Sequence, residues 1–404
     1  MLLRSPGACV FVLALLARLL GQIVLNAYTQ PRTWEYETIA NNLLAGQGYT
    51  YEIDGATYVA SQSSPLYIFL VAFVYLLTAH SQAAVLAIQA LLGAATAGLA
   101  TWLAARTCSL TAAWGAGLLV AVDPGLLVYA AELHSLTLDA LAFMALVCAA
   151  VALPWAPSSR RLALLGALFG LATLTRSTAL VLLPLVLGWL ARYRGLRVLS
   201  LRSAALVGAA VVVCAPWSVR NSLLLGQPVL VSSEASEWLW RGNNPAATGS
   251  SFSADGRRML DVAPAEFRAA VYTSSEAQRV SLYRDAALRF VREEPSQAAV
   301  LYLRKFKSFW WTSESTGLLY PREWLIGYVA WSALILLLGV IGGVSGLRSP
   351  TWRPEAWLIL LVLLVSALTQ SAFYVEGRHR LAVEPLMLVL GGVGLARLGC
   401  RQPP

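Results

Sequence analysis

Long apolar stretches alternate with short polar turns along most of this chain. A helix that crosses a membrane needs about 20 predominantly apolar residues, and ten stretches come near that pattern. They lie at about 8–28, 82–105, 110–129, 135–153, 162–175, 177–191, 203–217, 324–346, 355–373 and 381–398. The pattern therefore predicts an all-α polytopic membrane protein with about 10–11 transmembrane helices.

The stretch from Pro65 to Thr78 is apolar but only about two-thirds of the length of a span. If it does not cross the membrane and the N-terminus is cytoplasmic, the clustered arginines between the spans all fall on the cytoplasmic side, as the positive-inside rule favours. These groups are Arg4, Arg106, Arg160/Arg161, Arg192/Arg194/Arg197/Arg202, Arg348/Arg353 and Arg401. We therefore expect an interfacial or re-entrant helix over 65–78.

This topology places three segments on the external face: a loop at 29–81, a turn near 129–135 and a polar domain at 218–322. It divides the chain into an N-terminal transmembrane module (1–217), a small, mostly α external domain (218–322) and C-terminal transmembrane helices (323–404). The end of the external domain, 294–311, has the pattern of an amphipathic helix that lies on the membrane through aromatic side chains.

Composition supports the membrane assignment. Of the 404 residues, 58% are hydrophobic and 13% are charged, whereas soluble domains have about 25% charged residues. The net charge of +9 fits cytoplasmic loops and anionic lipid better than nucleic acid. The cysteines form neither a disulfide framework nor a metal-ligand spacing, and there is no Walker loop or dinucleotide-binding glycine pattern.

The first external loop carries a short amphipathic helix that begins with Glu35 and Glu37 and ends before Gly46 and Gly48. Acids at a helix start are often only solvated groups that stabilise the helix dipole. They are also placed to act as a general base at the membrane surface. Tyr36, between the two acids, is a candidate for the substrate pocket.

The segment from Asp123 to Asp139 brings three acids and a histidine between two spans, where ionisable groups are costly unless they serve a site or face water. The Asp123-Pro124 pair predicts a helix break. Glu132 and Asp139 would share a face on a continuous helix, and Asp139 is the stronger catalytic candidate. His134 is either a hydrogen-bonded structural residue or part of the substrate pocket.

Two further groups of polar residues are candidates for binding. Arg378 and Arg380, with Arg176 from another external turn, suit the oxygens of a phosphate, although basic residues near a span end also occur as ordinary snorkelling side chains. Arg220, Asn243 and Asn244 are groups that a sugar or head-group pocket uses, but turn chemistry alone also explains the segment around both asparagines.

Four motifs together give the chain a resemblance to a known family. They are Tyr36-x3-Ala40-x2-Leu43-Leu44-x-Gly46-x-Gly48-Tyr49 with Ser64-Pro65-Leu66-Tyr67; Pro216-Trp217-x2-Arg220-Asn221 with Gly242-Asn243-Asn244-Pro245-x2-Thr248-Gly249; Leu174-Thr175-Arg176; and Arg378-His379-Arg380-x4-Pro385. In this order they resemble the GT-C superfamily of polytopic glycosyltransferases, specifically the family 39-like bacterial relatives of protein mannosyltransferases and aminoarabinose transferases.

The resemblance implies sugar transfer on the external face from a polyprenyl-phosphate-linked donor, with an acid of the first external loop as base and an acid of the second in support. Family members usually have an Asp a few residues before the tyrosine that matches Tyr36. Here the preceding residues are Arg32, Thr33, Trp34 and Glu35. Either Glu35 or Glu37 therefore takes this role, and Asp139 or Glu132 supports it.

We therefore expect an inverting glycosyltransferase in the inner (plasma) membrane, with its active site on the external, periplasmic side. Its partners would be a lipid-linked sugar, membrane lipid and an acceptor that is protein, glycan or lipid, and no nucleic acid. We expect no covalently bound cofactor, and the sequence leaves a divalent metal open. A lipid or sugar transporter or flippase, and a catalytically inactive GT-C-like subunit, are the alternatives.

Overall fold

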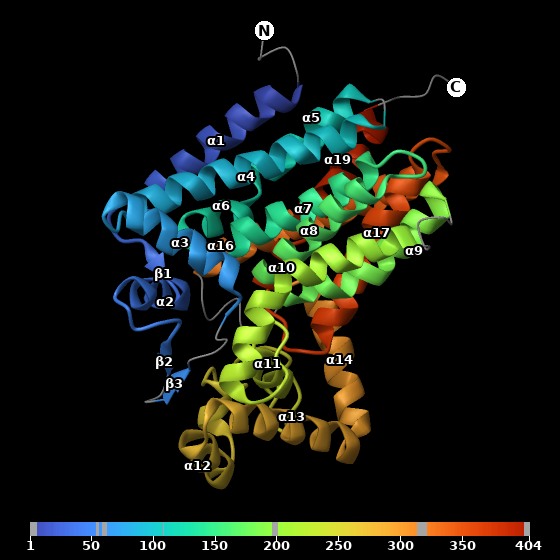
Figure 1. Cartoon of the computed structure of the whole chain (residues 1–404). Coiled ribbons are helices and arrows are strands. Elements are labelled where there is room, and N and C mark those ends of the chain that lie inside the picture. The colour runs from blue at the N-terminus through green and yellow to red at the C-terminus, as the bar shows by residue number, and fades with distance from the viewer. Residues whose placement is uncertain are drawn as a thin grey trace.

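The computed structural model describes residues 6–53, 56–58, 63–107, 109–195, 201–312 and 321–399. It is a helical bundle from which a smaller helical domain projects (Figure 1), so the predicted all-α fold is confirmed. Arg4, Arg197 and Arg401 lie outside the described residues. The bundle helices are α1 (Pro6–Val24), α4 (Gln82–Ala105), α5 (Leu110–Val122), α6 (Pro124–Ala130), α7 (Leu136–Ala152), α8 (Ser159–Thr175), α9 (Leu182–Arg194), α10 (Leu201–Leu225), α16 (Arg322–Arg348), α17 (Arg353–Ser371), α18 (Arg378–Leu381) and α19 (Glu384–Gly399).

Each of the ten apolar stretches is helical, but the helices differ in length. Five of the described helices are long and apolar enough to cross a membrane, namely α1, α4, α10, α16 and α17, and a sixth qualifies if α5 and α6 form one bent span. Helices α7 and α8 have 17 residues each, or about 26 Å, which is slightly less than the hydrocarbon core. The prediction of about 10–11 spans therefore counted shorter helices as well.

The predicted break at Asp123-Pro124 is confirmed. Helices α5 and α6 meet there at 49°, and the Asp123 carboxylate accepts a hydrogen bond from the amide of Leu126 at 2.9 Å, which caps α6. A second interruption follows at β4 (Glu132–Leu133). Glu132 and Asp139 therefore do not share a continuous helix, and the expectation that a common helical face aligns them is wrong.

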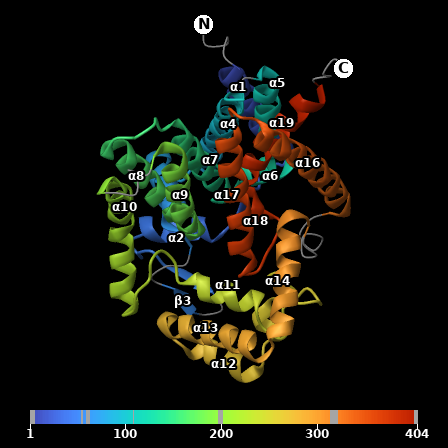
Figure 2. The same cartoon turned by 90° about the vertical axis from the view of Figure 1, so that its right-hand side faces the viewer.

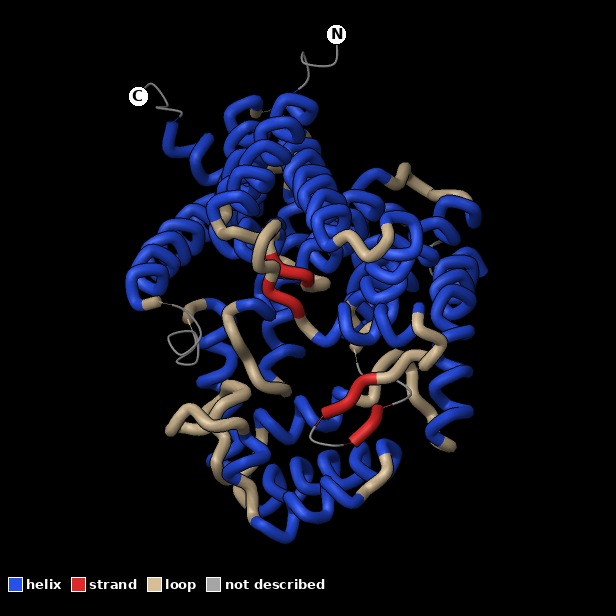
Figure 3. The backbone as a smooth tube through the Cα atoms, turned by 90° about the vertical axis from the view of Figure 1, so that its left-hand side faces the viewer, coloured by secondary structure: helices blue, strands red, loops and turns tan. Residues whose placement is uncertain are grey.

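The segment after α1 forms α2 (Glu35–Leu44) as predicted, and Gly46 and Gly48 follow it with positive φ angles of 76° and 79°. Just before α2, β1 (Arg32–Thr33) pairs in parallel with β4, so that the segment before α2 and the segment before α7 are joined (Figure 3). A second pair, β2 (Tyr51–Ile53) and β3 (Ala56–Tyr58), is antiparallel. Such short strands carry no periodic signal that the sequence could reveal.

Helix α3 (Pro65–Thr78) coincides with the ambiguous apolar stretch. Its 14 residues measure about 21 Å, less than the thickness of the hydrocarbon core. One face is buried through Tyr67, Ile68 and Val71, while Phe73 and Leu76 are exposed. An apolar exposed face of this length fits the interfacial or re-entrant position, which stays a prediction.

The projecting domain contains α11 (Glu234–Gly242), η4 (Met259–Val262), α12 (Ala265–Thr273), α13 (Glu276–Glu293) and α14 (Pro295–Trp310). Trp240, Met259 and Tyr283 form its small core. Helix α14 connects α13 to the bundle (Figure 2), and its Phe309 is buried in the bundle core. Its predicted position on the membrane surface stays a prediction. Helix α10 continues to Leu225, beyond the predicted domain boundary at 217/218, which stays a prediction.

Candidate functional site

A cavity of about 220 Å³ lies between the bundle and the projecting domain, and we name it the central cavity. A narrower space of about 50 Å³, the inner cleft, shares Tyr36, Arg176, Glu234 and Trp238 with it and adds Ser63 and Asp139. The central cavity is lined by Trp34, Glu35, Tyr36, Tyr51, His134, Leu136, Arg176, Glu234, Glu237, Trp238, Arg241, Tyr374, Arg378 and His379. Segments separated by hundreds of residues thus supply one polar chamber.

The two acids of α2 have different surroundings. Glu35 lines the central cavity, and its Oε1 accepts a hydrogen bond from Ser63 Oγ at 3.0 Å. Glu37 instead accepts hydrogen bonds from the hydroxyl of Tyr75 and, at 2.7 Å, from Nε2 of Gln82. The contacts of Glu37 connect α2 to α3 and α4, which leaves Glu35 as the acid of this helix that faces the cavity.

Ser63 holds a second acid beside Glu35. Its backbone amide donates to the carboxylate of Glu234, while the hydroxyl of Tyr49 donates to the Ser63 carbonyl at 3.1 Å. Ser63 has a φ of 65°, a left-handed conformation that costs a non-glycine residue of the order of 1 kcal/mol. Burial, together with the negative charges of Glu35 and Glu237, raises the pKa of Glu234 to about 8.

Asp139 and Arg176 form the floor of the inner cleft. Arg176 Nη1 donates to Asp139 Oδ2 at 3.4 Å, and Ser135 Oγ lies 3.2 Å from the same oxygen. Asp139 is 1% exposed, and its Oδ1 has no hydrogen-bond partner among the described residues. The sequence-predicted acid and arginine are therefore brought together, with one carboxylate oxygen left to accept a further donor.

Glu132 lies at the β1–β4 pair rather than in the central cavity. It accepts hydrogen bonds from Trp34 Nε1 at 2.9 Å and from Arg32 Nη1 at 3.4 Å. Burial raises its pKa in spite of these two donors. Its contacts therefore hold the segment that precedes Glu35.

His134 and Tyr36 form an aromatic wall of the central cavity. The His134 ring lies 5.0 Å from Trp34 and 5.2 Å from Tyr36, edge to face. Its Nδ1 accepts a hydrogen bond from the amide of Leu136 at 3.1 Å. Burial, and then the nearby Arg378 and Arg176, lower the pKa of His134 well below its usual range, so the ring is neutral at neutral pH.

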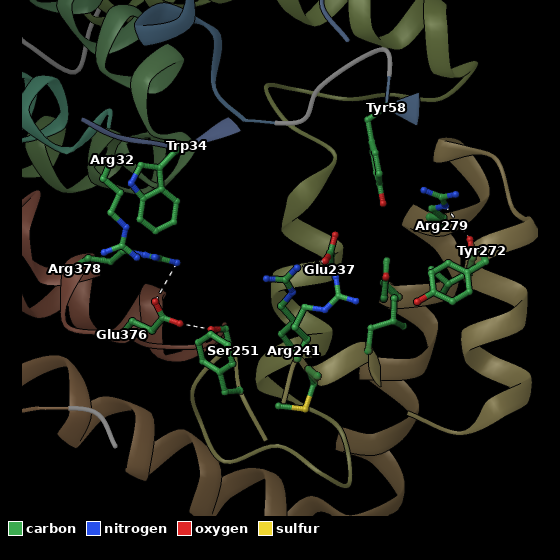
Figure 4. Close-up of a pocket in the computed structure, with 16 residues that line it drawn as sticks. Arg32, Trp34, Tyr58, Glu237, Arg241, Ser251, Tyr272, Arg279, Glu376 and Arg378 are labelled. Atoms are coloured by element: carbon green, nitrogen blue, oxygen red, sulfur yellow. Dashed lines mark hydrogen bonds and ion pairs between the residues drawn. The ribbon is translucent and has the colours of Figure 1, made fainter. Parts of the chain in front are cut away.

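Arg378 lies between three cavities and contributes to the lining of each. It lines the central cavity, an apolar groove of about 570 Å³ and an outer cavity of about 340 Å³. It forms an ion pair with Glu376 at 3.0 Å, and its Cζ lies 5.0 Å from the centre of the Trp34 ring. Figure 4 shows the outer cavity with Arg378 beside Trp34 on one side.

The apolar groove is lined mainly by α1, α6 and α16, and its charged lining residues are Glu376 and Arg378. The other lining residues are Gly21, Val24, Leu25, Val122, Pro124, Gly125, Leu127, Val128, Tyr129, Trp324, Leu325, Gly327, Tyr328, Trp331, Gly377 and Leu381. A groove of this kind, mostly apolar but with an arginine in its lining, matches an amphiphile with an anionic head.

Other predicted site residues do not line these four cavities. Arg380 is 1% exposed and donates to Glu384 at 3.0 Å and to the carbonyl of Trp310 at 2.6 Å. Arg220 lies 4.7 Å from the ring of Trp217 on the same helix and 5.5 Å from the ring of Tyr49 in the segment after α2. These contacts connect neighbouring elements, so the geometry gives both arginines bracing roles.

The two asparagines also serve as braces. Asn243 Nδ2 donates to the carbonyl of Ala372 at 2.8 Å, and its Oδ1 accepts from Lys305 Nζ at 3.0 Å. Asn244 donates to the carbonyl of Trp240 at 2.8 Å. This network joins α11 and α14 to the loop before Arg378, as the turn interpretation of this segment favours.

Sequence reasoning missed several cavity residues. Glu234, Glu237 and Arg241 come from α11, and Ser63 comes from the segment before α3. A signal was available for two of them, because Glu237 and Arg241 are spaced i, i+4 and form an ion pair in the structure. Among the described residues, no three His, Cys, Asp or Glu side chains gather in a way that could hold a metal ion.

Part of the sequence matches a known protein family. The profile of the dolichyl-phosphate-mannose-protein mannosyltransferases matches residues 62–219. This segment runs from the residue before Ser63 to the last two turns of α10 and includes Asp139 and Arg176. No curated protein matches the chain.

Among solved structures, the archaeal oligosaccharyltransferase AglB from Archaeoglobus fulgidus is similar in two complexes. The complex with an inhibitory peptide and a dolichol-phosphate has 13% identity and a TM-score of 0.57, and the match covers 96% of this chain and 50% of that one. The complex with Zn and sulfate has 15% identity and a TM-score of 0.56, with 96% and 48% covered. The chain thus spans about half the length of AglB.

A more distant match is ArnT from Cupriavidus metallidurans bound to undecaprenyl phosphate, with 15% identity, a TM-score of 0.44 and coverage of 96% of this chain and 77% of that one. The similarity to AglB extends over nearly all of this chain and concerns its fold. This protein is accordingly a multi-pass integral membrane protein with the GT-C fold.

Proposed function

We propose that this protein is an inverting membrane glycosyltransferase that moves a sugar from a polyprenyl-phosphate-linked donor to an acceptor on the external face. The observation that carries the proposal is the position of Arg378. It lines both the apolar groove and the central cavity, which contains Glu35. One lipid molecule can therefore place its chain in the groove, its phosphate at Arg378 and its sugar near a carboxylate.

The donor would bind with its isoprenoid chain along α1, α6 and α16. Burial of its apolar surface favours binding by about 25 cal/mol per Å². Arg378 and Arg176 would bind the phosphate, since guanidinium groups match phosphate oxygens in geometry and charge. The structure of AglB with a dolichol-phosphate supports a donor of this lipid class.

In the reaction, the Glu35 carboxylate would accept the proton of the acceptor hydroxyl as its oxygen attacks the anomeric carbon of the donor sugar. A bond forms between that oxygen and carbon, and the bond from carbon to the phosphate oxygen breaks. The electron pair leaves with the polyprenyl phosphate, whose charge Arg378 and Arg176 stabilise. Attack opposite the leaving group inverts the anomeric configuration.

Ser63 and Asp139 would keep this arrangement in place. The Ser63 hydroxyl orients Glu35, and Asp139 orients Arg176 through their ion pair of 3.4 Å. Glu132 would act one step further away, through Trp34 and Arg32. Positioning residues of this kind matter because catalysis falls steeply when reacting groups are misplaced by about 1 Å.

The test uses the purified full chain in liposomes, supplied with a panel of polyprenyl-phosphate sugars and a crude extract of envelope lipids and glycans. We expect mass spectrometry to detect free polyprenyl phosphate together with a product heavier by one sugar, and NMR to detect the inverted anomer. A flippase would instead move the intact lipid across the bilayer without releasing polyprenyl phosphate. Failure to consume any donor would support an inactive subunit.

A further inference from the structure

The proposed lipid-linked donor does not explain the charged lining of the outer cavity or the shape of that cavity. It lies between the projecting domain and the first external loop, with walls from β1, β3, α11, α12 and α13 (Figure 4). Its charged lining residues are Arg32, Arg241, Arg258, Arg279, Arg378, Glu237 and Glu376. Five guanidinium groups thus face two carboxylates, an excess of positive charge within the lining itself.

Ion pairs within the lining neutralise only part of this charge. Glu237 pairs with Arg241, and Glu376 pairs with Arg378 at 3.0 Å. Arg279 is 6% exposed, and its Nε donates to the carbonyl of Val271 at 2.9 Å. Arg279 has no carboxylate ion pair among the described residues. A buried arginine without a carboxylate partner favours an anionic ligand.

The remaining two arginines lie at the rim. Arg32 and Arg258 pair with acids outside the lining, Glu132 at 3.4 Å and Asp261 at 3.0 Å. In Figure 4, Arg32 and Arg378 lie on one side of the cavity, and Arg279 lies on the opposite side. A ligand with negative groups can therefore be held from both sides.

Aromatic side chains form a further part of the lining. Trp34, Tyr58 and Tyr272 face the cavity from different elements (Figure 4), and Arg279 Cζ lies 5.0 Å from the centre of the Tyr58 ring. Aromatic faces with a few convergent polar groups are typical of pockets for small polar ligands such as sugars.

The outer cavity is also joined to the proposed reaction centre. Trp34, Glu237, Arg241 and Arg378 line both the outer and the central cavity. We propose that the outer cavity is the acceptor site and that it binds a saccharide that carries a phosphate or carboxylate group. This inference rests on the proposed function, because it assigns the second substrate of that reaction.

Binding of disaccharides to the full chain in nanodiscs, without donor, tests the inference independently of transfer. The probes are trehalose 6-phosphate, digalacturonic acid and neutral trehalose, and the dissociation constants are measured by isothermal titration calorimetry at low salt. We expect at least one anionic probe to bind about tenfold or more tightly than trehalose, and its affinity to fall with added salt. The tighter anionic probe identifies phosphate or carboxylate as the recognised group.

Variants locate the binding site. Arg279→Gln and Arg258→Gln should each weaken the anionic probe by about tenfold, since each removes a charged hydrogen-bond donor, and Arg279→Lys should restore part of the loss. Arg284→Gln is the matched control, because Arg284 is an exposed arginine of α13 that pairs with Asp285 at 2.9 Å and does not line the cavity. Arg258 is itself exposed, so its variant tests the site even if Arg279→Gln misfolds.

Equal binding of the three probes, absence of binding by both anionic probes, or unchanged affinity in Arg258→Gln would overturn the inference. Each of these results leaves the release of polyprenyl phosphate, and hence the proposed function, untouched. Conversely, a chain that consumes no donor but binds an anionic saccharide through Arg258 would refute the transferase and retain the saccharide site.

Discussion

Two regions of this molecule contain the same kinds of charged residue and use them in opposite ways. In the cavity region, Glu35 and Arg378 face open space. In the packed region, Glu37 is held by Tyr75 and Gln82, and Arg380 by Glu384 and the carbonyl of Trp310. Each pair is only two positions apart in the chain.

The difference follows from helical geometry. Residues i and i+2 on a helix do not face each other, so a short helix at the edge of a cavity directs one of them into it and the other into its neighbours. In this way α2 directs Glu35 into the cavity and Glu37 into its neighbours, and α18 does the same for Arg378 and Arg380. A charge near a site is therefore not evidence of catalysis until its partners are known.

The largest expected effect separates Glu35 from Glu37. Glu35→Gln should lower kcat for transfer from the polyprenyl-phosphate sugar by about 10²–10⁴-fold, because it removes the general base. Glu37→Gln should change kcat less than about threefold, since its contacts lie in the packing of α2 against α3 and α4. The difference in kcat is measured by radiolabelled product formation with both variants, at equal amounts of folded protein. Equal losses of kcat in the two variants would contradict the different roles of Glu35 and Glu37.

Arg378 and Arg380 give the next test. Arg378→Gln should reduce kcat by about 10²–10³-fold through lost stabilisation of the leaving phosphate. Its loss of stability should be smaller than that of Arg380→Gln, because the Glu376 carboxylate keeps its hydrogen bond from Ser251. Arg380→Gln leaves the carboxylate of Glu384 buried without its partner and should destabilise the fold by about 3–5 kcal/mol. Transfer assays and thermal unfolding of both variants distinguish the two roles. A more active Arg378→Gln than Arg380→Gln at equal folded concentration would reverse our assignment.

The apolar groove can be narrowed without disturbing the cavity. Gly327 lines the groove, and a Cβ built on it meets no atom within 4 Å. Gly327→Leu should therefore fold and raise the KM for the lipid-linked donor about tenfold, as expected for a crowded lipid site. Gly208→Leu is the control, since Gly208 on α10 has the same open surroundings and does not line the groove. An unchanged KM in Gly327→Leu would show that the donor does not bind in the apolar groove.

The smallest expected effect concerns Glu234 and pH. The pKa of Glu234 is raised from 4.5 to about 8, so the folded protein binds a proton that the unfolded chain releases between these values. Its contribution to stability is fully present below about pH 4.5 and is lost as pH rises through about pH 8, by up to about 1.4 kcal/mol per pH unit. Glu234→Gln should lack this loss.

Thermal unfolding from about pH 5 to about pH 9 measures this difference. The melting temperature of the wild type should fall relative to that of Glu234→Gln by a few degrees, at about 1 °C per kcal/mol for a chain of 404 residues. Asp285→Asn, at an exposed site of α13, should keep the wild-type slope. Parallel curves for wild type and Glu234→Gln would show that Glu234 is not buried in its protonated form.

Much of the fold was predictable because its signals are local. Apolar stretches of helical length marked the bundle helices, Gly46 and Gly48 marked the end of α2, and the Asp123-Pro124 pair marked the break between α5 and α6. The β1–β4 pair was not predictable, because it joins two-residue strands about 100 positions apart, and neither strand has a periodic pattern.

The candidate site was predictable only in part. Glu35, Tyr36, His134, Arg176 and Arg378 were named from the sequence and do line the central cavity, although their chemical roles stay predictions. Arg220, Arg380 and both asparagines were named for the same reason, that polar groups near a membrane surface suggest a site. The structure surrounds them with intramolecular partners instead.

The sequence by itself determined which segments are apolar helices and which loops carry charge, since both follow from the composition and spacing of neighbouring residues. Only the tertiary structure decided which charge of each pair faces the cavity, and that α11 adds Glu234 and Glu237 to it. The physical reason is that the packing of distant segments leaves some side chains uncovered, and these side chains line the cavity. That outcome depends on contacts between distant segments, such as Ser63 with Glu35 and Arg378 with Trp34.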